Sequence, residues 1–171
     1  MRHKDMHWRA MSALDLGAVE AIAAVVHPKF PERGEVLAER RLLYPHGAHL
    51  LEIGERPVGY ALSHPWMQQS IPALDTLLGE LPAAADSYYL HDIALLPVAR
   101  RIGAATLIVK ALLKHAEARG FATASLVAVN GSEGFWARQG FVPLDSPDLI
   151  GKLLSYEAGA RYMVKTIAVA G

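Results

Sequence analysis

Residues 88–141 read YYLHDIALLPVARRIGAATLIVKALLKHAEARGFATASLVAVNGSEGFWARQGF, and this stretch decides the fold. Aromatic and branched side chains fill Tyr88–Leu95, which predicts a strand. Over Arg100–Arg119 apolar residues recur at helical spacing and Gly120 follows as a C-cap, which predicts an amphipathic helix. Phe121–Val129 is largely apolar and predicts a second strand, buried on both faces. The stretch therefore predicts a strand, a helix and a strand in succession.

The flanking sequence continues this alternation of strands and helices. Before the central stretch we expect a strand over 7–11, helices over 14–26 and 32–44, a hairpin of strands 49–53 and 58–64, and an inserted loop over 65–86 with one or two helical turns. After it we expect a helix over 132–139 and strands over 141–144 and 161–168. This pattern is typical of an α/β fold, and a length of 171 residues suits a single domain spanning residues 1–171.

The composition argues against several classes of function. Seventeen basic side chains balance seventeen acidic ones, so no broad positive field attracts nucleic acid. With no cysteine, the chain has no disulfide framework, thiolate zinc site or cysteine nucleophile. The eight histidines are scattered without a helical HxxxH pair, so we expect no metal. The start does not resemble a secretory signal and no window approaches a membrane helix, so we expect a cytoplasmic protein that does not enter membranes.

The turn between the first strand and the helix of this stretch has the features of a phosphate-binding loop. At a helix start several backbone N–H groups have no partner within the helix. Gly103 and Ala105 leave room for a pyrophosphate, the helix N-terminus favours negative charge, and Arg100 and Arg101 add positive charge. An ordinary strand-to-helix turn with a glycine for packing has the same pattern, so the turn alone leaves both interpretations open.

Three motifs in the same order resemble the Gcn5-related N-acetyltransferase (GNAT) family. Arg100-x-x-Gly103-x-Ala105 is similar to the Q/R-x-x-G-x-G/A signature of that family. The preceding Leu90–Pro97 resembles its central strand, and Asn130 followed by Phe135–Phe141 resembles its N...(F/L)-Y-x-x-x-G-F segment. A Rossmann dinucleotide-binding protein is disfavoured because the G-x-G-x-x-G motif and its later acidic residue are missing.

The resemblance implies a GNAT fold, with a mixed central sheet of about seven strands that splays between strands 4 and 5. It also implies acetyl-CoA as co-substrate, with backbone groups of Ile93 and Leu95 pairing with the pantetheine arm. The resemblance further implies that the N–H groups from Ile102 to Thr106 hold the pyrophosphate and that Asn130 contacts the arm. The cofactor-binding residues expected on this basis are Ile93, Leu95, Arg100, Arg101, Ile102, Gly103, Ala104, Ala105, Thr106, Asn130 and Trp136.

His91 is the first candidate for the base that removes a proton from the acceptor amine. Histidine has an unperturbed pKa of about 6.5, which suits proton transfer around neutrality. Strand alternation places Tyr89, His91, Ile93 and Leu95 on one face and Asp92 on the other. Asp92 is the second candidate, either as the base or as the carboxylate that attracts the ammonium group. A structural role inside the sheet is the alternative for both residues.

Trp136 stands where many members of the family have the tyrosine thought to protonate the departing thiolate. An indole N–H cannot serve as that acid, so Trp136 is expected to pack or to form a wall of the cofactor slot. Ser132, and Tyr156 in the late loop over 145–160, are the remaining candidates for a group near the sulfur. Solvent can also protonate the thiolate, because an unperturbed thiol has a pKa of about 8.5.

Two functions remain open from the sequence. The leading one is an N-acetyltransferase that passes acetyl from acetyl-CoA directly to a primary amine in a ternary complex. The alternative is a GNAT-like module that binds acyl-CoA in a sensory or structural role with little turnover. The acceptor can be a small molecule or a protein amine, and a homodimer is expected because many relatives pair.

Overall fold

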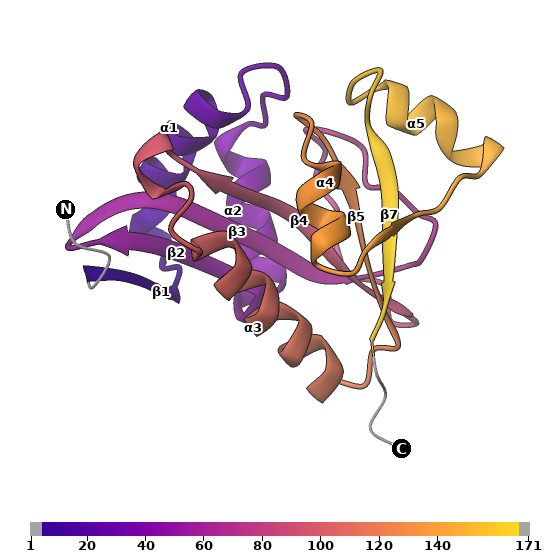
Figure 1. Cartoon of the computed structure of the whole chain (residues 1–171), viewed down its shortest axis with the longest axis horizontal. Helices are drawn as coiled ribbons and strands as arrows, with labels where there is room; N and C mark the ends of the chain where they lie inside the picture. The colour runs from indigo at the N-terminus through magenta and orange to yellow at the C-terminus, as the bar shows by residue number, and fades with distance from the viewer. Residues whose placement is uncertain (1–4, 168–171) are drawn as a thin grey trace.

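The computed structural model describes residues 5–167, which form a seven-stranded sheet with helices on both faces (Figure 1). The strands lie in the order β1-β2-β3-β4-β5-β7-β6. Their bounds are β1 Met6–Ala10, β2 Ala48–Ile53, β3 Arg56–Trp66, β4 Ser87–Leu95, β5 Thr123–Ala128, β6 Val142–Pro143 and β7 Arg161–Thr166. The β4–β5 pair is parallel and every other neighbouring pair is antiparallel, so the predicted mixed sheet is confirmed. Residue 168, at the end of the last predicted strand, lies outside the described residues.

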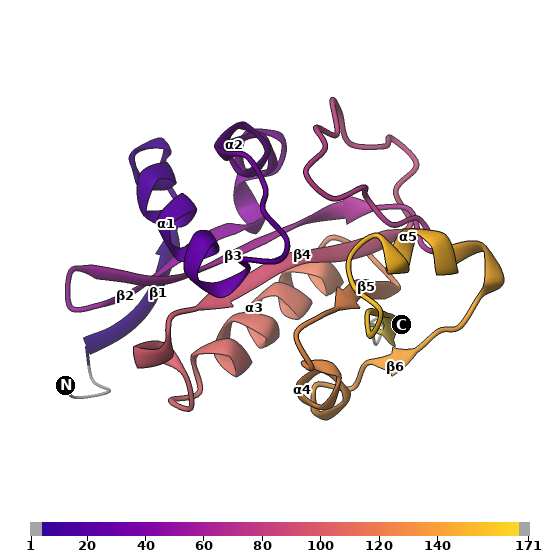
Figure 2. The same cartoon turned by 90° about the horizontal axis from the view of Figure 1, so that it is seen from above.

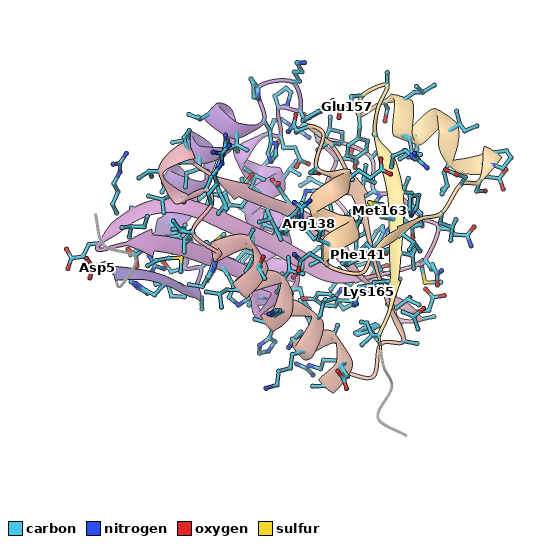
Figure 3. All side chains as sticks on the ribbon, in the orientation of Figure 1. Asp5, Arg138, Phe141, Glu157, Met163 and Lys165 are labelled. Atoms are coloured by element: carbon cyan, nitrogen blue, oxygen red, sulfur yellow. The ribbon has the colours of Figure 1, made fainter. Side chains whose placement is uncertain are left out.

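The helices divide between the two faces of the sheet, as Figure 2 shows from above. Their bounds are α1 Leu16–Val26, α2 Gly34–Leu43, α3 Ala104–Ala118, α4 Glu133–Arg138 and α5 Ile150–Leu154. Apolar side chains of α1 and α2 pack on β2 and β3 to form one core, while α3 and α4 pack on β4, β5 and β7 to form another. Phe141 and Met163, labelled in Figure 3, belong to the second core. No helix within residues 5–167 is both long and apolar enough to cross a membrane.

The sheet splits between β4 and β5. The two strands pair only at Tyr88–Leu90 with Ala124–Leu126, and past these residues no register joins them. The β4 edge from His91 to Leu95 is therefore free on the side of β5. This confirms the splay between the fourth and fifth strands.

A bulge in β4 places His91 and Asp92 on the same face of the sheet. Leu62 of β3 pairs with Asp92, but the next residue, Ser63, pairs with Leu90, so His91 is the extra residue. Asp92 and His91 both bond to residues of the segment between α1 and α2. The prediction from strict alternation, which separated the two side chains, is wrong because the bulge interrupts the two-residue period.

The connection between β3 and β4 covers residues 67–86 and contains turns but no helix, so the predicted helical turns are absent there. It is tied to the start of α2 by polar contacts: Asp75 accepts hydrogen bonds from the backbone and side chain of Arg33, and Arg40 donates to the Thr76 carbonyl. Ile71 packs with Leu149, which precedes α5. Such contacts explain how a connection longer than about 12–15 residues stays ordered without secondary structure.

Candidate functional site

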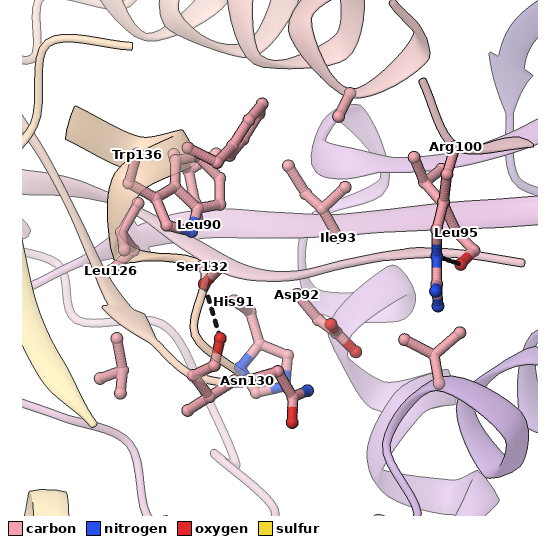
Figure 4. A pocket seen from close by; sticks show the side chains of 15 residues that line it. Leu90, His91, Asp92, Ile93, Leu95, Arg100, Leu126, Asn130, Ser132 and Trp136 are labelled. Atoms are coloured by element: carbon pink, nitrogen blue, oxygen red, sulfur yellow. Dashed lines mark hydrogen bonds between the residues drawn. The ribbon is translucent and has the colours of Figure 1, made fainter. Parts of the chain in front are cut away.

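A cavity of about 340 Å³ lies in the split between β4 and β5, and we call it the slot (Figure 4). Apolar side chains of both strands and of α4 form most of its wall, with Leu90, Leu126 and Trp136 among them. The sequence-predicted residues that line it are His91, Asp92, Ile93, Leu95, Arg100, Ala105, Asn130, Ser132 and Trp136. A mostly apolar cavity beside a free strand edge suits a ligand that carries both amide groups and hydrocarbon.

The turn that leads into α3 presents an unpaired row of backbone N–H groups. Among residues 5–167, the amides of residues 101–106 have no protein acceptor. Gly103 has φ of 82° and Arg101 has φ of 62°, so two left-handed residues bend the chain around the helix start. Trp8 anchors the turn from β1 by donating from its indole to the Ala104 carbonyl at 2.9 Å. Unpaired amides arranged in this way at a helix start can bind an anion.

The two arginines of this turn differ in position. Arg100 lines the slot and donates from Nε to the Leu95 carbonyl at 3.2 Å, a contact drawn in Figure 4. Arg101 is exposed and contributes no wall to the slot. The structure therefore puts one guanidinium at the slot and leaves the second at the surface beside the amide row.

His91 is paired with a carboxylate that the sequence did not reveal. Its Nε2 donates to Glu32 Oε1 at 2.9 Å, and its buried Nδ1 has no hydrogen-bond partner within the described chain. Burial alone would raise the pKa of Glu32, but the charge and hydrogen bond of His91, with Arg40 nearby, lower it to about 2. An ionised Glu32 fixes the tautomer with hydrogen on Nε2, which leaves Nδ1 as the basic atom.

Asp92 is held by two side chains from different elements. His27, just after α1, donates from Nε2 to Asp92 Oδ1 at 2.7 Å, and the Tyr60 hydroxyl of β3 donates to Oδ2. Burial lowers the pKa of His27, but the charge and hydrogen bond of Asp92 outweigh it and the net shift is upward. Burial and the Asp92 charge raise the pKa of Tyr60, so its hydroxyl stays a donor. Asp92 thus accepts one hydrogen bond at each carboxylate oxygen, and it lies in the wall of the slot.

The residues after β5 reach towards α1. Asn130, with φ of 56°, donates from its side-chain amide to His27 Nδ1 at 3.2 Å and from its backbone N–H to Glu157 at 2.8 Å. Glu157 lies in the loop before β7 (Figure 3). Ser132 lines the slot, but its hydroxyl donates to the Val129 carbonyl at 2.6 Å (Figure 4). Both residues are therefore already engaged with protein groups.

The structure does not bring Tyr156 to the slot. Its hydroxyl donates to the Pro72 carbonyl at 2.6 Å, within the connection between β3 and β4, and it is absent from the wall of the slot. Three functional candidates were missed by sequence reasoning, namely His27, Glu32 and Tyr60. The only signal for them was the His27-Pro28 break after a helix with an acid soon after it, which does not reveal a partner far along the chain.

The contact between Glu32 and His91 should make the free energy of unfolding depend on pH in the acid range. The pKa of Glu32 falls from 4.5 to about 2 on folding, so the stabilisation is complete above pH 4.5 and is lost as the pH falls towards 2. We expect the difference in unfolding free energy between wild type and Glu32→Gln to shrink by about 2 kcal/mol from pH 6 to pH 3. Urea denaturation at both pH values measures it, with Glu35→Gln, an exposed neighbour, as the control. An equal difference at both pH values would contradict the assigned pair.

Comparisons with known proteins give the same architecture. The profile of the Acetyltransferase (GNAT) family matches residues 16–141. No sequence match was found among curated proteins. Similar solved structures include the GphF GNAT-like decarboxylase in complex with isobutyryl-CoA, with a TM-score of 0.79, 15% identity, and coverage of 95% of this chain and 100% of that one.

Two further solved structures are similar to this chain. The ribosomal-protein-S18-alanine N-acetyltransferase from Escherichia coli has a TM-score of 0.67 and 18% identity, covering 97% of this chain and 96% of that one. Arabidopsis thaliana Naa50, in complex with a bisubstrate analogue, has a TM-score of 0.69 and 15% identity, covering 94% of this chain and 97% of that one. At these identities the likeness establishes the fold.

Proposed function

The chain belongs to the Acetyltransferase (GNAT) family, and from this premise we propose that it transfers acetyl from acetyl-CoA directly to a primary amine. The observation that carries the proposal is the row of unpaired amides over residues 101–106, which lies where β4 leads into α3 and next to the slot. Unpaired amides at a helix start bind a diphosphate, and the slot accommodates the remaining arm.

The cofactor half of the proposal rests on backbone groups of the chain. The β4 edge that faces the split is not paired with β5 beyond Leu90, so Ile93 and the Leu95 N–H can pair with the amides of a pantetheine arm, while the Leu95 carbonyl accepts from Arg100. Arg100 adds a positive charge at the slot, and Trp136 closes its far wall with an apolar face. The small side chain of Ala105 and the absence of one at Gly103 keep the helix start accessible.

The chemical half of the proposal uses His91 as the base. The amine nitrogen attacks the thioester carbon, the C–S bond breaks, and the amine proton passes to the imidazole of His91, a residue of the slot wall. Glu32 holds Nε2 and stabilises the imidazolium that forms. Asp92 attracts the ammonium form of the acceptor to the slot, and the ammonium loses one proton to solvent before the neutral amine attacks. The leaving thiolate takes its proton from solvent, because neither Trp136 nor Tyr156 presents an acid there.

Release of free thiol tests the proposal. The protein is incubated with acetyl-CoA and a panel of primary amines, and thiol release and the N-acetyl product are followed by a thiol reagent and mass spectrometry. We expect thiol release that depends on the amine. Tight binding of acetyl-CoA without thiol release for any amine would contradict the enzyme and favour a binding module.

A second candidate function is decarboxylation of a carboxyacyl-CoA, and Trp136 is the observation that favours it. In this reaction the C–C bond to the carboxylate breaks, CO2 leaves, and the electron pair that remains on the α-carbon takes up a proton. The C–S bond stays intact and no thiolate leaves, so this reaction needs no acid on α4 to protonate a thiolate. GphF, one of the structurally similar proteins, is described as a GNAT-like decarboxylase.

Malonyl-CoA without an amine separates the two candidates. Decarboxylation gives acetyl-CoA and CO2 with no free thiol, whereas transfer gives free thiol only when an amine is present. Mass spectrometry of the CoA species after each incubation distinguishes these products. Formation of acetyl-CoA from malonyl-CoA at a rate above that of the amine reaction would replace the first candidate by the second.

A further inference from the structure

A second cavity lies on the α1 side of the sheet and meets the slot at one residue. Its volume is about 300 Å³, and α1, the segment between α1 and α2, and the sheet at Tyr60 enclose it. Asp92 lines this cavity and the slot alike, and His27 stands beside it in the cavity wall. We call this space the acceptor cavity, because a molecule in it reaches the slot across the Asp92 carboxylate.

The acceptor cavity carries negative charge. Its wall contains the carboxyl groups of Glu20, Glu32 and Asp92, and no lysine or arginine lines it. Glu32 and Asp92 are matched by histidines, whereas Glu20 makes no ion pair within the described residues. The Glu20 carboxylate lies against Gly34, where a Cβ would come within 1.7 Å of it. Apart from His27 and Tyr60, the remaining wall is apolar, with Phe30 and Leu37.

The opposite approach to the slot, between the α1–α2 segment and the loop before β7, is bridged by protein contacts. Asn130 joins the two sides by donating to His27 and to Glu157. Tyr156 ties the loop before β7 to the connection between β3 and β4 through the Pro72 carbonyl, at 2.6 Å. A peptide chain lying across this region would have to break these bonds, so the acceptor cavity is the open route to Asp92.

We propose that the acceptor cavity binds the acyl acceptor, and that the acceptor is a small primary amine whose only charges are positive. This inference rests on the proposed acetyl transfer. A volume of about 300 Å³ stands at the lower end of ligand cavities and holds a short amine rather than a protein terminus. Asp92 receives the reacting ammonium at the slot, and the unmatched Glu20 favours a second positive charge and opposes a carboxylate.

Three acceptors of equal chain length test the inference. They are 1,4-diaminobutane with a second ammonium, butylamine with an apolar end, and 4-aminobutanoate with a carboxylate. We expect kcat/KM to fall in that order, with the diamine preferred over butylamine by about tenfold and 4-aminobutanoate at least about 100-fold below the diamine. Equal or better use of 4-aminobutanoate, or of a peptide with a free N-terminus, would overturn the inference while leaving acetyl transfer intact.

The variant Glu20→Gln locates the preference in the cavity. We expect it to raise KM for 1,4-diaminobutane about tenfold with little change in kcat, and to leave butylamine unaffected. The control Glu55→Gln removes a carboxylate that is exposed, as Glu20 is, but lies outside the cavity in the turn between β2 and β3, and its kinetics should match wild type. A diamine preference that survives in Glu20→Gln would overturn the assignment of the acceptor cavity.

Binding measured without turnover separates this inference from the proposed function. Calorimetry with 1,4-diaminobutane and protein saturated with CoA reports amine binding alone. Binding that weakens about tenfold in Glu20→Gln supports the cavity even where no acetyl product forms, and the proposed function then fails alone. Absence of diamine binding together with acetylation of other amines would overturn the cavity and preserve the function.

Discussion

Replacing Gly103 by glutamate is expected to weaken acetyl-CoA binding by at least 100-fold. The new carboxylate would stand at the amide row of residues 101–106, where the proposed diphosphate is held. Two like charges about 5 Å apart repel by about 3 kcal/mol at an effective dielectric constant of about 20, and 1.4 kcal/mol corresponds to a factor of ten in affinity. Isothermal titration with acetyl-CoA measures the loss.

The variant Gly103→Gln is the matched control. Glutamine has the size and shape of glutamate, and both must adopt the left-handed φ of 82° that glycine tolerates. Strain of about 1–2 kcal/mol therefore affects both variants equally, and within residues 5–167 the new Cβ meets nothing within 4 Å beyond its immediate neighbours along the chain. We expect Gly103→Gln to retain far more affinity than Gly103→Glu. Equal affinities would show that no anion is bound at this turn.

The parts of the site that sequence reasoning found are those set by neighbouring residues. A glycine before a helix, small side chains in the first turn and a proline after the strand act within a few positions. They predicted the turn at Gly103 and the strand and helix around it, which the structure confirms. The order and splay of the sheet came from the family resemblance, since no local rule places a gap between two strands.

The parts that sequence reasoning missed depend on distant partners. The His27–Asp92 and Glu32–His91 contacts span 65 and 59 residues, and both need the bulge that turns His91 and Asp92 to the same face. A bulge has no sequence mark here, because β4 contains no glycine or proline. The alternating pattern therefore placed His91 and Asp92 on opposite faces of the sheet, and it gave no sign that Glu32 pairs with His91.

Replacing His91 by glutamine is expected to lower kcat by about 100-fold to 1000-fold and to leave the Kd of acetyl-CoA unchanged. The glutamine amide can still donate a hydrogen bond to Glu32, so the buried carboxylate keeps a partner, but it cannot accept the amine proton. Positioned bases contribute about 10²–10⁴ to rate. Steady-state kinetics across pH, with acetyl-CoA binding by titration, measure both quantities.

The shape of the pH profile separates a base from a structural residue at this position. A base requires the neutral imidazole, so the wild-type rate should show a pH dependence beyond that of deprotonating the acceptor amine, and this additional part should vanish in His91→Gln. A purely structural histidine would change the level of the profile and leave its shape. The variant His27→Gln provides the comparison, because its amide can donate to Asp92 as the imidazole Nε2 does. Loss of the pH dependence in His27→Gln, with the profile of His91→Gln unchanged in shape, would transfer the role of base to His27.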